Sequence, residues 1–297
     1  MCTSGVSAEV TKELPRPKID KTAIDALLYG IWKSLEYLGK QRRALLEKIE
    51  AETLQHLIDT GDIPSDARPV DRASSLRELL LENGYGPSLA KRSKGNQGTS
   101  VIPSLVDIMK PDENHMTVGR ASGRRPVDKQ KVSWALYEAV LYGMTSALDD
   151  QLGAQAQLLL QRIGAGMLEY LIEVGVIENS DDLETLAQRV ADYYVSAGYT
   201  RSFRGGLEGP NVWVSRYESA PYFPNVVRRL RDEGCALFSC PLCLTGQSVW
   251  ISQGWRFGDV LELRISPSGN VTARSKVYPP AERFTERDAR KLSQTKE

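Results

Sequence analysis

The chain has 297 residues, of which 41% are hydrophobic and 26% are charged, so it is long enough to bury two cores of ordinary size. Lys plus Arg and Asp plus Glu each number 38, and this balance disfavours a nucleic-acid-binding protein, which normally has a surplus of basic residues. No run of about 18 apolar residues is present, so we expect no membrane-spanning segment.

The N-terminus and the cysteines indicate the cytoplasm. The first ten residues lack the basic start and the apolar stretch of a secretory signal. Three of the four cysteines, Cys235, Cys240 and Cys243, lie within nine residues of one another. Secreted disulfide-stabilised proteins instead distribute their cysteines through a smaller chain.

An internal repeat is visible in the sequence. Three blocks of the first half recur in the second half, in the same order, 113 or 114 residues later. The paired blocks are Ala26–Gly30 with Ala139–Gly143, His56–Ile63 with Tyr170–Ile177, and Asn83–Gly86 with Ala197–Thr200. We infer that a helical module was duplicated.

Each copy is predicted to contain one long helix, a link and a second helix. In the first copy, apolar residues recur at spacings of three and four from Ile24 to Leu38, and the stripe continues from Leu45 to Ile58. Gly61 and its equivalent Gly175 stand where a left-handed residue would end the long helix. The second helix is predicted to end at Gly84 in the first copy and at Gly198 in the second.

Only the second copy continues into strand-like sequence. Val212–Tyr217 alternates and is rich in β-formers, Asn225–Glu233 is predicted as a short helix, and residues 261–277 are typical of a hairpin. Gly205–Gly209 is predicted as a loop. The expected fold class is α+β and predominantly helical: a duplicated helix-pair module whose second copy is completed by a small antiparallel sheet and a cysteine-bearing segment.

The same features suggest five parts along the chain. They are a flexible N-terminal tail at 1–22, a truncated helical copy at 23–117, a basic linker at 118–131, a complete α+β copy at 132–280 and a C-terminal tail at 281–297.

The cysteines form the sharpest local motif, Cys235-Ala-Leu-Phe-Ser-Cys240-Pro-Leu-Cys243. Thiolates at this C-x4-C-x2-C spacing can converge on a soft metal, which makes zinc a candidate cofactor and the three cysteines its candidate ligands. An iron–sulfur pattern would need a fourth cysteine downstream, and none follows Cys243. Buried structural cysteines and redox chemistry remain the alternatives.

Aromatic residues gather in the second copy, which suggests an apolar ligand pocket. The candidate wall combines four residues of the predicted long helix with three bulky aromatic residues. These residues are Met144, Leu148, Leu159, Ile163, Trp213, Phe238 and Trp250. The alternative is that they form the core of a small β layer under the helices. With two histidines and no set of nucleophile, base and orienting residue, the chain shows no enzymatic motif.

The second copy resembles the 4-vinyl reductase domain, a small-molecule-binding module related to subunits of the TRAPP tethering complex. The resemblance covers residues 135–278, and the first copy shares only its helices. It rests on Gly143, Gly164, Gly198, Tyr199, the run Pro221–Asn225, Cys235, Cys243 and Gly246. Where that family has a late Gly-x-x-x-Cys, this chain has Gly269 followed by Ala273, which puts in doubt a metal site that uses the late cysteine.

The resemblance implies an apolar ligand pocket without a fixed reaction. We therefore expect a non-catalytic binding or accessory protein that takes an apolar small molecule or a lipid. Two alternatives stay open: a scaffold or assembly subunit without a ligand, in which a protein partner or a homodimer is expected, and a zinc or iron–sulfur accessory protein.

Overall fold

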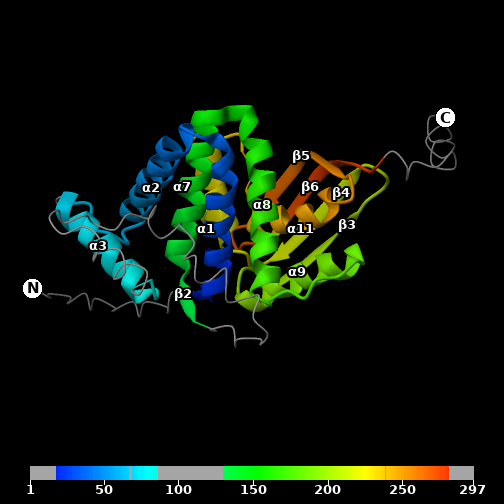
Figure 1. Ribbon diagram of the computed structural model, residues 1–297, viewed down its shortest axis with the longest axis horizontal. Helices are drawn as coiled ribbons and strands as arrows, with labels where there is room; N and C mark the ends of the chain where they lie inside the picture. The colour runs from blue at the N-terminus through cyan, green and yellow to red at the C-terminus, as the bar shows by residue number, and fades with distance from the viewer. Residues whose placement is uncertain (1–17, 67–68, 86–129, 238, 281–297) are drawn as a thin grey trace, which may run out of the picture.

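A computed structural model describes residues 18–66, 69–85, 130–237 and 239–280. Helices fill one side of the molecule and a four-stranded sheet covers the other (Figure 1). This arrangement confirms the expected α+β, mostly helical class. No helix among the described residues is long and apolar enough to cross a membrane.

The described parts of the two copies begin with the same helices in the same order. The first has α1 (Lys21–Leu35), the short turn η1 (Glu36–Leu38), α2 (Gln41–Asp59) and α3 (Pro69–Glu82). The second has α7 (Trp134–Leu152), η2 (Gly153–Gln155), α8 (Ala156–Glu173) and α9 (Leu183–Ala197). The duplicated helical module is therefore confirmed.

The prediction of a single long helix in each copy is wrong, because two helices occupy that part of the chain. Gly153, with a φ of 48°, caps α7, and Gly39, with a φ of 53°, caps the short turn η1 that follows α1; L side chains rarely adopt this conformation. The chain then turns back into α2 and α8. The predicted ends at Gly61 and Gly175 are confirmed, with φ values of 76° and 75°.

The first two helices of each copy pack against helices of the other copy. Helix α1 packs along α8 of the second copy, and α2 packs along α7, so each first helix lies on the second helix of the other copy. Two short strands, β1 (Lys18–Asp20) and β2 (Lys131–Ser133), pair antiparallel with Ile19 opposite Val132. Since these two residues are equivalent in the repeat, a pseudo-two-fold axis passes between them.

Both short strands lie where no ordered element was expected. Residues 18–22 were assigned to the N-terminal tail, yet they form β1 and begin α1, and Lys131 of the expected linker begins β2. Ile19 and Val132 are completely buried, which explains why these ends are held against the helices.

The sheet is antiparallel, and all of its strands among the described residues come from the second copy. Its strands are β3 (Ser202–Leu207), β4 (Val212–Glu218), β5 (Arg256–Ile265) and β6 (Val271–Tyr278), in the order β3-β4-β6-β5. The expected hairpin is β5–β6 and is confirmed. Gly205 and Gly206 lie in β3, where Gly205 pairs with Ser215 of β4, so the loop predicted at 205–209 is wrong for its first part, and the turn begins only after Leu207.

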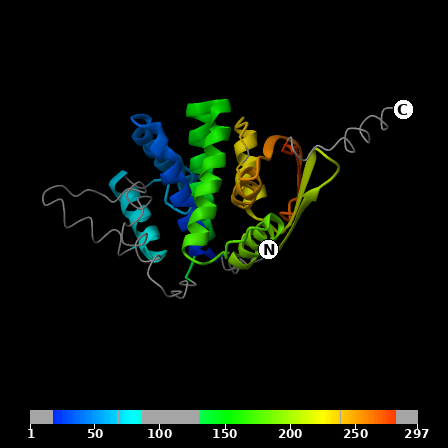
Figure 2. The same cartoon turned by 45° about the vertical axis from the view of Figure 1, so that its right-hand side comes forward.

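One helix, α11 (Pro241–Ile251), lies between the sheet and helices α8 and α9 (Figures 1 and 2). It approaches α8 at Gly164, where an added Cβ would lie 2.3 Å from the carbonyl oxygen of Leu244. The π-helical turn η3 (Phe223–Val227) and helix α10 (Arg228–Asp232) form the expected short helix. The cysteine motif is thus held between the sheet and the helical layer.

Candidate functional site

The N-terminus of α11 brings two of the three cysteines together. Cys240 is the N-cap residue, in an extended conformation, and Pro241 follows in the first turn, where a missing N–H costs nothing. The Cys243 N–H donates to Cys240 Sγ at 3.4 Å. Cys240 is completely buried, whereas Cys243 is partly exposed.

Tyrosine hydroxyls surround this pair. Tyr217 of β4 places its hydroxyl oxygen 2.6 Å from Cys243 Sγ and 3.3 Å from Cys240 Sγ. Tyr199, which follows α9, donates to Cys240 Sγ at 3.5 Å. The sheet therefore contacts both sulfur atoms, and the residue after α9 contacts that of Cys240.

A network of buried hydroxyls extends from the sulfur pair into the helical layer. Tyr222 donates to the backbone carbonyl of Ser239, and the Ser239 hydroxyl contacts that of Thr145 on α7. Tyr194 of α9 and Thr245 of α11 share a hydrogen bond of 3.0 Å. We call the set the hydroxyl–thiol cluster: Tyr137, Thr145, Tyr194, Tyr199, Tyr217, Tyr222, Ser239, Cys240, Cys243 and Thr245.

One member of the cluster lacks a hydrogen bond. The Tyr137 hydroxyl is fully buried and has no partner among the described residues. It lies near Cys240 and Tyr222, whose proximity adds to the effect of burial in raising its pKa. Burial likewise raises the pKa of Tyr194 and Tyr222, so these hydroxyls stay protonated and serve as hydrogen-bond donors.

The two paired thiols have opposite tendencies to ionise. Burial disfavours a thiolate at Cys240, but hydrogen bonds from Cys243, Tyr199 and Tyr217 outweigh it and hold the Cys240 pKa below its ordinary value. The neighbouring sulfur of Cys240, together with burial, raises the pKa of Cys243 well above its ordinary value. A single negative charge shared by the pair would reside on Cys240.

Cys235 does not join the pair. It precedes α11 by several residues, its sulfur contacts the carbonyl of Leu237 at 3.9 Å, and burial raises its pKa to about 11. Among the described residues, no three His, Cys, Asp or Glu side chains are placed to hold a metal ion. The zinc site expected from Cys235, Cys240 and Cys243 is therefore not formed, because the four-residue spacer directs Cys235 toward Asp149 instead.

The residues expected to line an apolar pocket fall into two groups. Met144, Leu148, Leu159 and Ile163 are buried in the main core between the helices. Trp213 and Trp250 contact each other with ring centroids 5.8 Å apart and pack on a second cluster of Trp255, Phe257 and Val277. Phe238 lies outside the described residues. A pocket walled by all seven residues stays a prediction.

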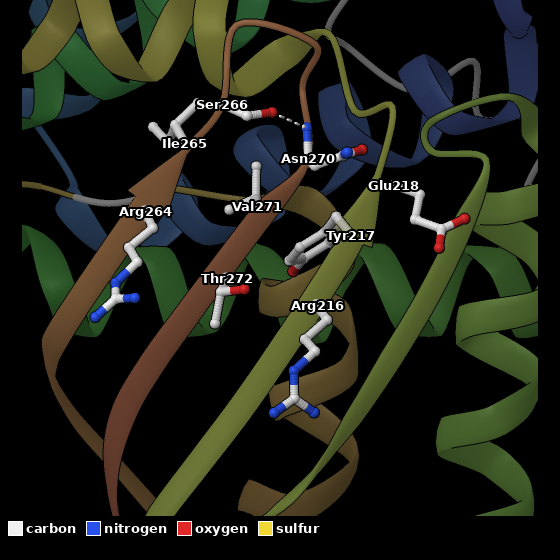
Figure 3. Close-up of a pocket in the computed structure, with 9 residues that line it drawn as sticks. All are labelled: Arg216, Tyr217, Glu218, Arg264, Ile265, Ser266, Asn270, Val271 and Thr272. Atoms are coloured by element: carbon white, nitrogen blue, oxygen red, sulfur yellow. Dashed lines mark hydrogen bonds between the residues drawn. The ribbon is translucent and has the colours of Figure 1, made fainter.

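A hollow that the sequence did not suggest lies near the β5–β6 turn of the sheet (Figure 3). Its volume is about 510 Å³, and Arg216, Arg264 and Thr272 contribute side chains from three neighbouring strands. The strand register places these residues in one row across the sheet, a relationship that needs the pairing of distant strands. None of the seven expected pocket residues lines this hollow.

No protein-family model and no curated protein matches the chain. Among solved structures, a variant of the Tt H-NOX protein aligns over 68% of this chain and 98% of its own, with 7% identity and a TM-score of 0.32. An oxygen-binding H-NOX domain related to soluble guanylate cyclases aligns over 58% of this chain and 87% of its own, with 8% identity and a TM-score of 0.31. The chain is thus similar to H-NOX domains only at a level too low to carry an argument about fold, cofactor or activity.

Proposed function

We propose that the second copy is a non-catalytic binding module that encloses a small, mainly apolar molecule, and that the chain acts in a regulatory or accessory capacity. The observation that supports this function is the Tyr137 hydroxyl, fully buried and without a partner inside the hydroxyl–thiol cluster. Leaving a buried hydroxyl unpaired costs about 1–3 kcal/mol. A ligand with one polar group would remove that cost when it binds.

The surroundings of Tyr137 suit a molecule that is apolar apart from one polar group. Met144 and Leu148 follow Tyr137 by seven and eleven residues, so all three lie on one face of α7. Both are completely buried. The polar end of the ligand would accept a hydrogen bond from Tyr137, and its apolar part would follow Met144 and Leu148 along the helix.

The substitution Tyr137→Phe tests this proposal. Without ligand, it removes the unpaired hydroxyl and should raise the free energy of unfolding by about 1 kcal/mol. The same change should weaken binding of Nile red, an apolar dye with a carbonyl acceptor, several-fold in a fluorescence titration. Saturable binding by the unsubstituted chain is the first requirement.

Tyr194→Phe is the matched control. Tyr194 is equally buried, but its hydroxyl is satisfied by Thr245 at 3.0 Å. This change should lower the free energy of unfolding by about 1 kcal/mol and leave the dye affinity unchanged. If the unsubstituted chain does not bind the dye, or if both variants bind it equally well, the ligand proposal fails.

A role as an assembly subunit is the second candidate. Tyr37 and Leu158 are 72% and 68% exposed. The Arg162 guanidinium, one turn after Leu158 on α8, stacks on the Tyr37 ring at 4.2 Å. A protein partner or a second copy of the chain would cover this patch, and Leu158→Lys should then reduce the molar mass measured by light scattering.

A further inference from the structure

We propose that Cys240 and Cys243 form a reversible disulfide, so that the start of α11 is a redox switch operated by low-molecular-weight thiols and disulfides. Both cysteines belong to the hydroxyl–thiol cluster, but the bond between them can form whether or not the ligand proposed above binds.

The geometry of the pair needs little change for the bond to form. Residues three apart on a helix have Cβ atoms about 5–6 Å apart, whereas a disulfide needs about 4 Å. Cys240 is the N-cap, with φ −129° and ψ 117°, so its backbone is extended, and its carbonyl accepts the first hydrogen bond of α11 from the Leu244 N–H at 2.7 Å. Both sulfur atoms already contact the same Tyr217 hydroxyl, at 3.3 and 2.6 Å.

The environment of the pair differs from that of inert buried cysteines, which are surrounded by apolar atoms. The Tyr199 hydroxyl donates to the Cys240 sulfur, the Tyr217 hydroxyl lies within hydrogen-bond distance of it, and the Cys243 N–H at the start of α11 points at it as well. These donors stabilise a thiolate, the reactive form in thiol–disulfide exchange. The lowered pKa of Cys240 agrees with this arrangement.

Exposure decides which sulfur meets the oxidant. Cys240 is completely buried, whereas the residue Cys243 is partly exposed, so we assign the first attack to Cys243. Cys243 first passes its proton to the Cys240 thiolate, and its sulfur then attacks one sulfur of the disulfide, forms a mixed disulfide and releases one thiolate, which takes that proton from Cys240. The Cys240 thiolate then attacks Cys243 Sγ, closes the Cys240–Cys243 bond and releases the second thiolate. The protons lost by the two cysteines end on the two released thiols, so the dithiol is oxidised and the small disulfide is reduced.

Closing the bond would change the contacts of the sheet. In the reduced state the Tyr217 hydroxyl of β4 contacts both sulfurs and thereby connects the sheet to α11. In the oxidised state no thiolate remains to accept its hydrogen bond. The oxidation state of the pair would therefore alter the hydroxyl–thiol cluster where the ligand is proposed to bind.

The test uses the full chain with Cys2→Ser, incubated with oxidised glutathione, alkylated and mapped by mass spectrometry. We expect a Cys240–Cys243 cross-link that lowers the free thiol content by two per chain and that dithiothreitol reverses. The mapping on this chain alone decides the proposal, even if a cysteine variant does not fold. A cross-link to Cys235, no cross-link at all, or one tightly bound zinc ion per chain that blocks alkylation would overturn it.

Three variants identify the role of each sulfur. Cys235→Ala is the matched control and should form the same cross-link, because Cys235 lies apart from the pair. Cys240→Ser should accumulate glutathione on Cys243, since the second attacking sulfur is missing. Cys243→Ser should take up little glutathione, because Cys240 is buried. Equal glutathione uptake in the last two variants would contradict the assigned order of attack.

Discussion

Gly30 and Gly143 occupy equivalent places on opposite sides of the pseudo-two-fold axis. A Cβ added to Gly30 would lie 2.5 Å from the carbonyl oxygen of Ile163, and one added to Gly143 would lie 2.7 Å from the carbonyl oxygen of Ile49. Ile49 and Ile163 are themselves equivalent in the repeat, being 114 residues apart. Each first helix thus approaches the backbone of the other copy's second helix through a glycine.

The first prediction concerns these two contacts. Gly30→Ala and Gly143→Ala should each lower the free energy of unfolding by about 1–3 kcal/mol, since a methyl group must push two helix backbones apart. Gly246→Ala is the control, because an added Cβ there meets no atom within 4 Å and alanine favours the helix. Urea unfolding of the three variants gives the comparison. Equal free energies of unfolding for all three variants would show that α1 and α8, and α7 and α2, do not approach each other closely at Gly30 and Gly143.

A second prediction concerns the turns that divide each expected long helix. Gly39→Ala and Gly153→Ala should each cost about 1–3 kcal/mol, although space around both residues is open, because their φ values of 53° and 48° strain an L side chain. Gly206→Ala also enters open space but at an ordinary strand φ, so it should cost less. Thermal unfolding measures all three. No loss at Gly39 and Gly153 would indicate that η1 and α7 end for another reason.

The third prediction concerns Glu138, which is 8% exposed and accepts a hydrogen bond from Asn225. Burial raises its pKa from 4.5 to about 7. Between these values the folded carboxyl keeps a proton that the unfolded carboxyl has lost, so the free energy of unfolding should fall as pH rises from 4.5 to about 7. The free energy of unfolding should fall by about 3 kcal/mol in total over this pH range. Glu138→Gln should abolish this part of the pH dependence, which is measured by urea unfolding at a series of pH values.

The fourth prediction concerns His56, whose ring stacks on Tyr142 with centroids 4.5 Å apart and whose Nδ1 accepts from Arg229 at 3.2 Å. Burial, with the nearby Arg229 charge, lowers its pKa from 6.5 to about 4. The unfolded histidine binds a proton in this range and the folded one does not. The free energy of unfolding should therefore fall as pH drops from 6.5 to about 4, also by about 3 kcal/mol in total.

The titrations of Glu138 and His56 change the free energy of unfolding in opposite directions over nearly the same pH range. The free energy of unfolding of the unsubstituted chain should therefore depend only weakly on pH. In the His56→Gln variant only the Glu138 titration remains, so the free energy of unfolding should decrease as pH rises. In the Glu138→Gln variant only the His56 titration remains, so the free energy of unfolding should increase as pH rises. Parallel pH profiles for the two variants would rule out one of the assigned pKa shifts.

Local sequence determined much of the helical layer. The apolar spacing from Ile24 to Ile58 predicted helix, and Gly61 and Gly84 predicted helix ends, because both signals act between residues close in the chain. The internal repeat predicted the duplicated module. The division at Gly39 was missed because the apolar spacing continues through it, and only the positive φ of that glycine shows the turn.

The tertiary structure alone decided which helices and which cysteines meet. The repeat did not reveal that α1 packs on α8, since two copies of one helix pair can bury the same apolar faces within a copy or between copies. The cysteine spacing was compatible with three ligands on one metal, yet α11 pairs Cys240 with Cys243 and leaves Cys235 apart. The hydroxyls of Tyr137, Tyr199 and Tyr217 come from distant parts of the chain and meet near the sulfur pair. Their meeting depends on contacts between residues far apart in sequence, and local sequence patterns contain no information about such contacts.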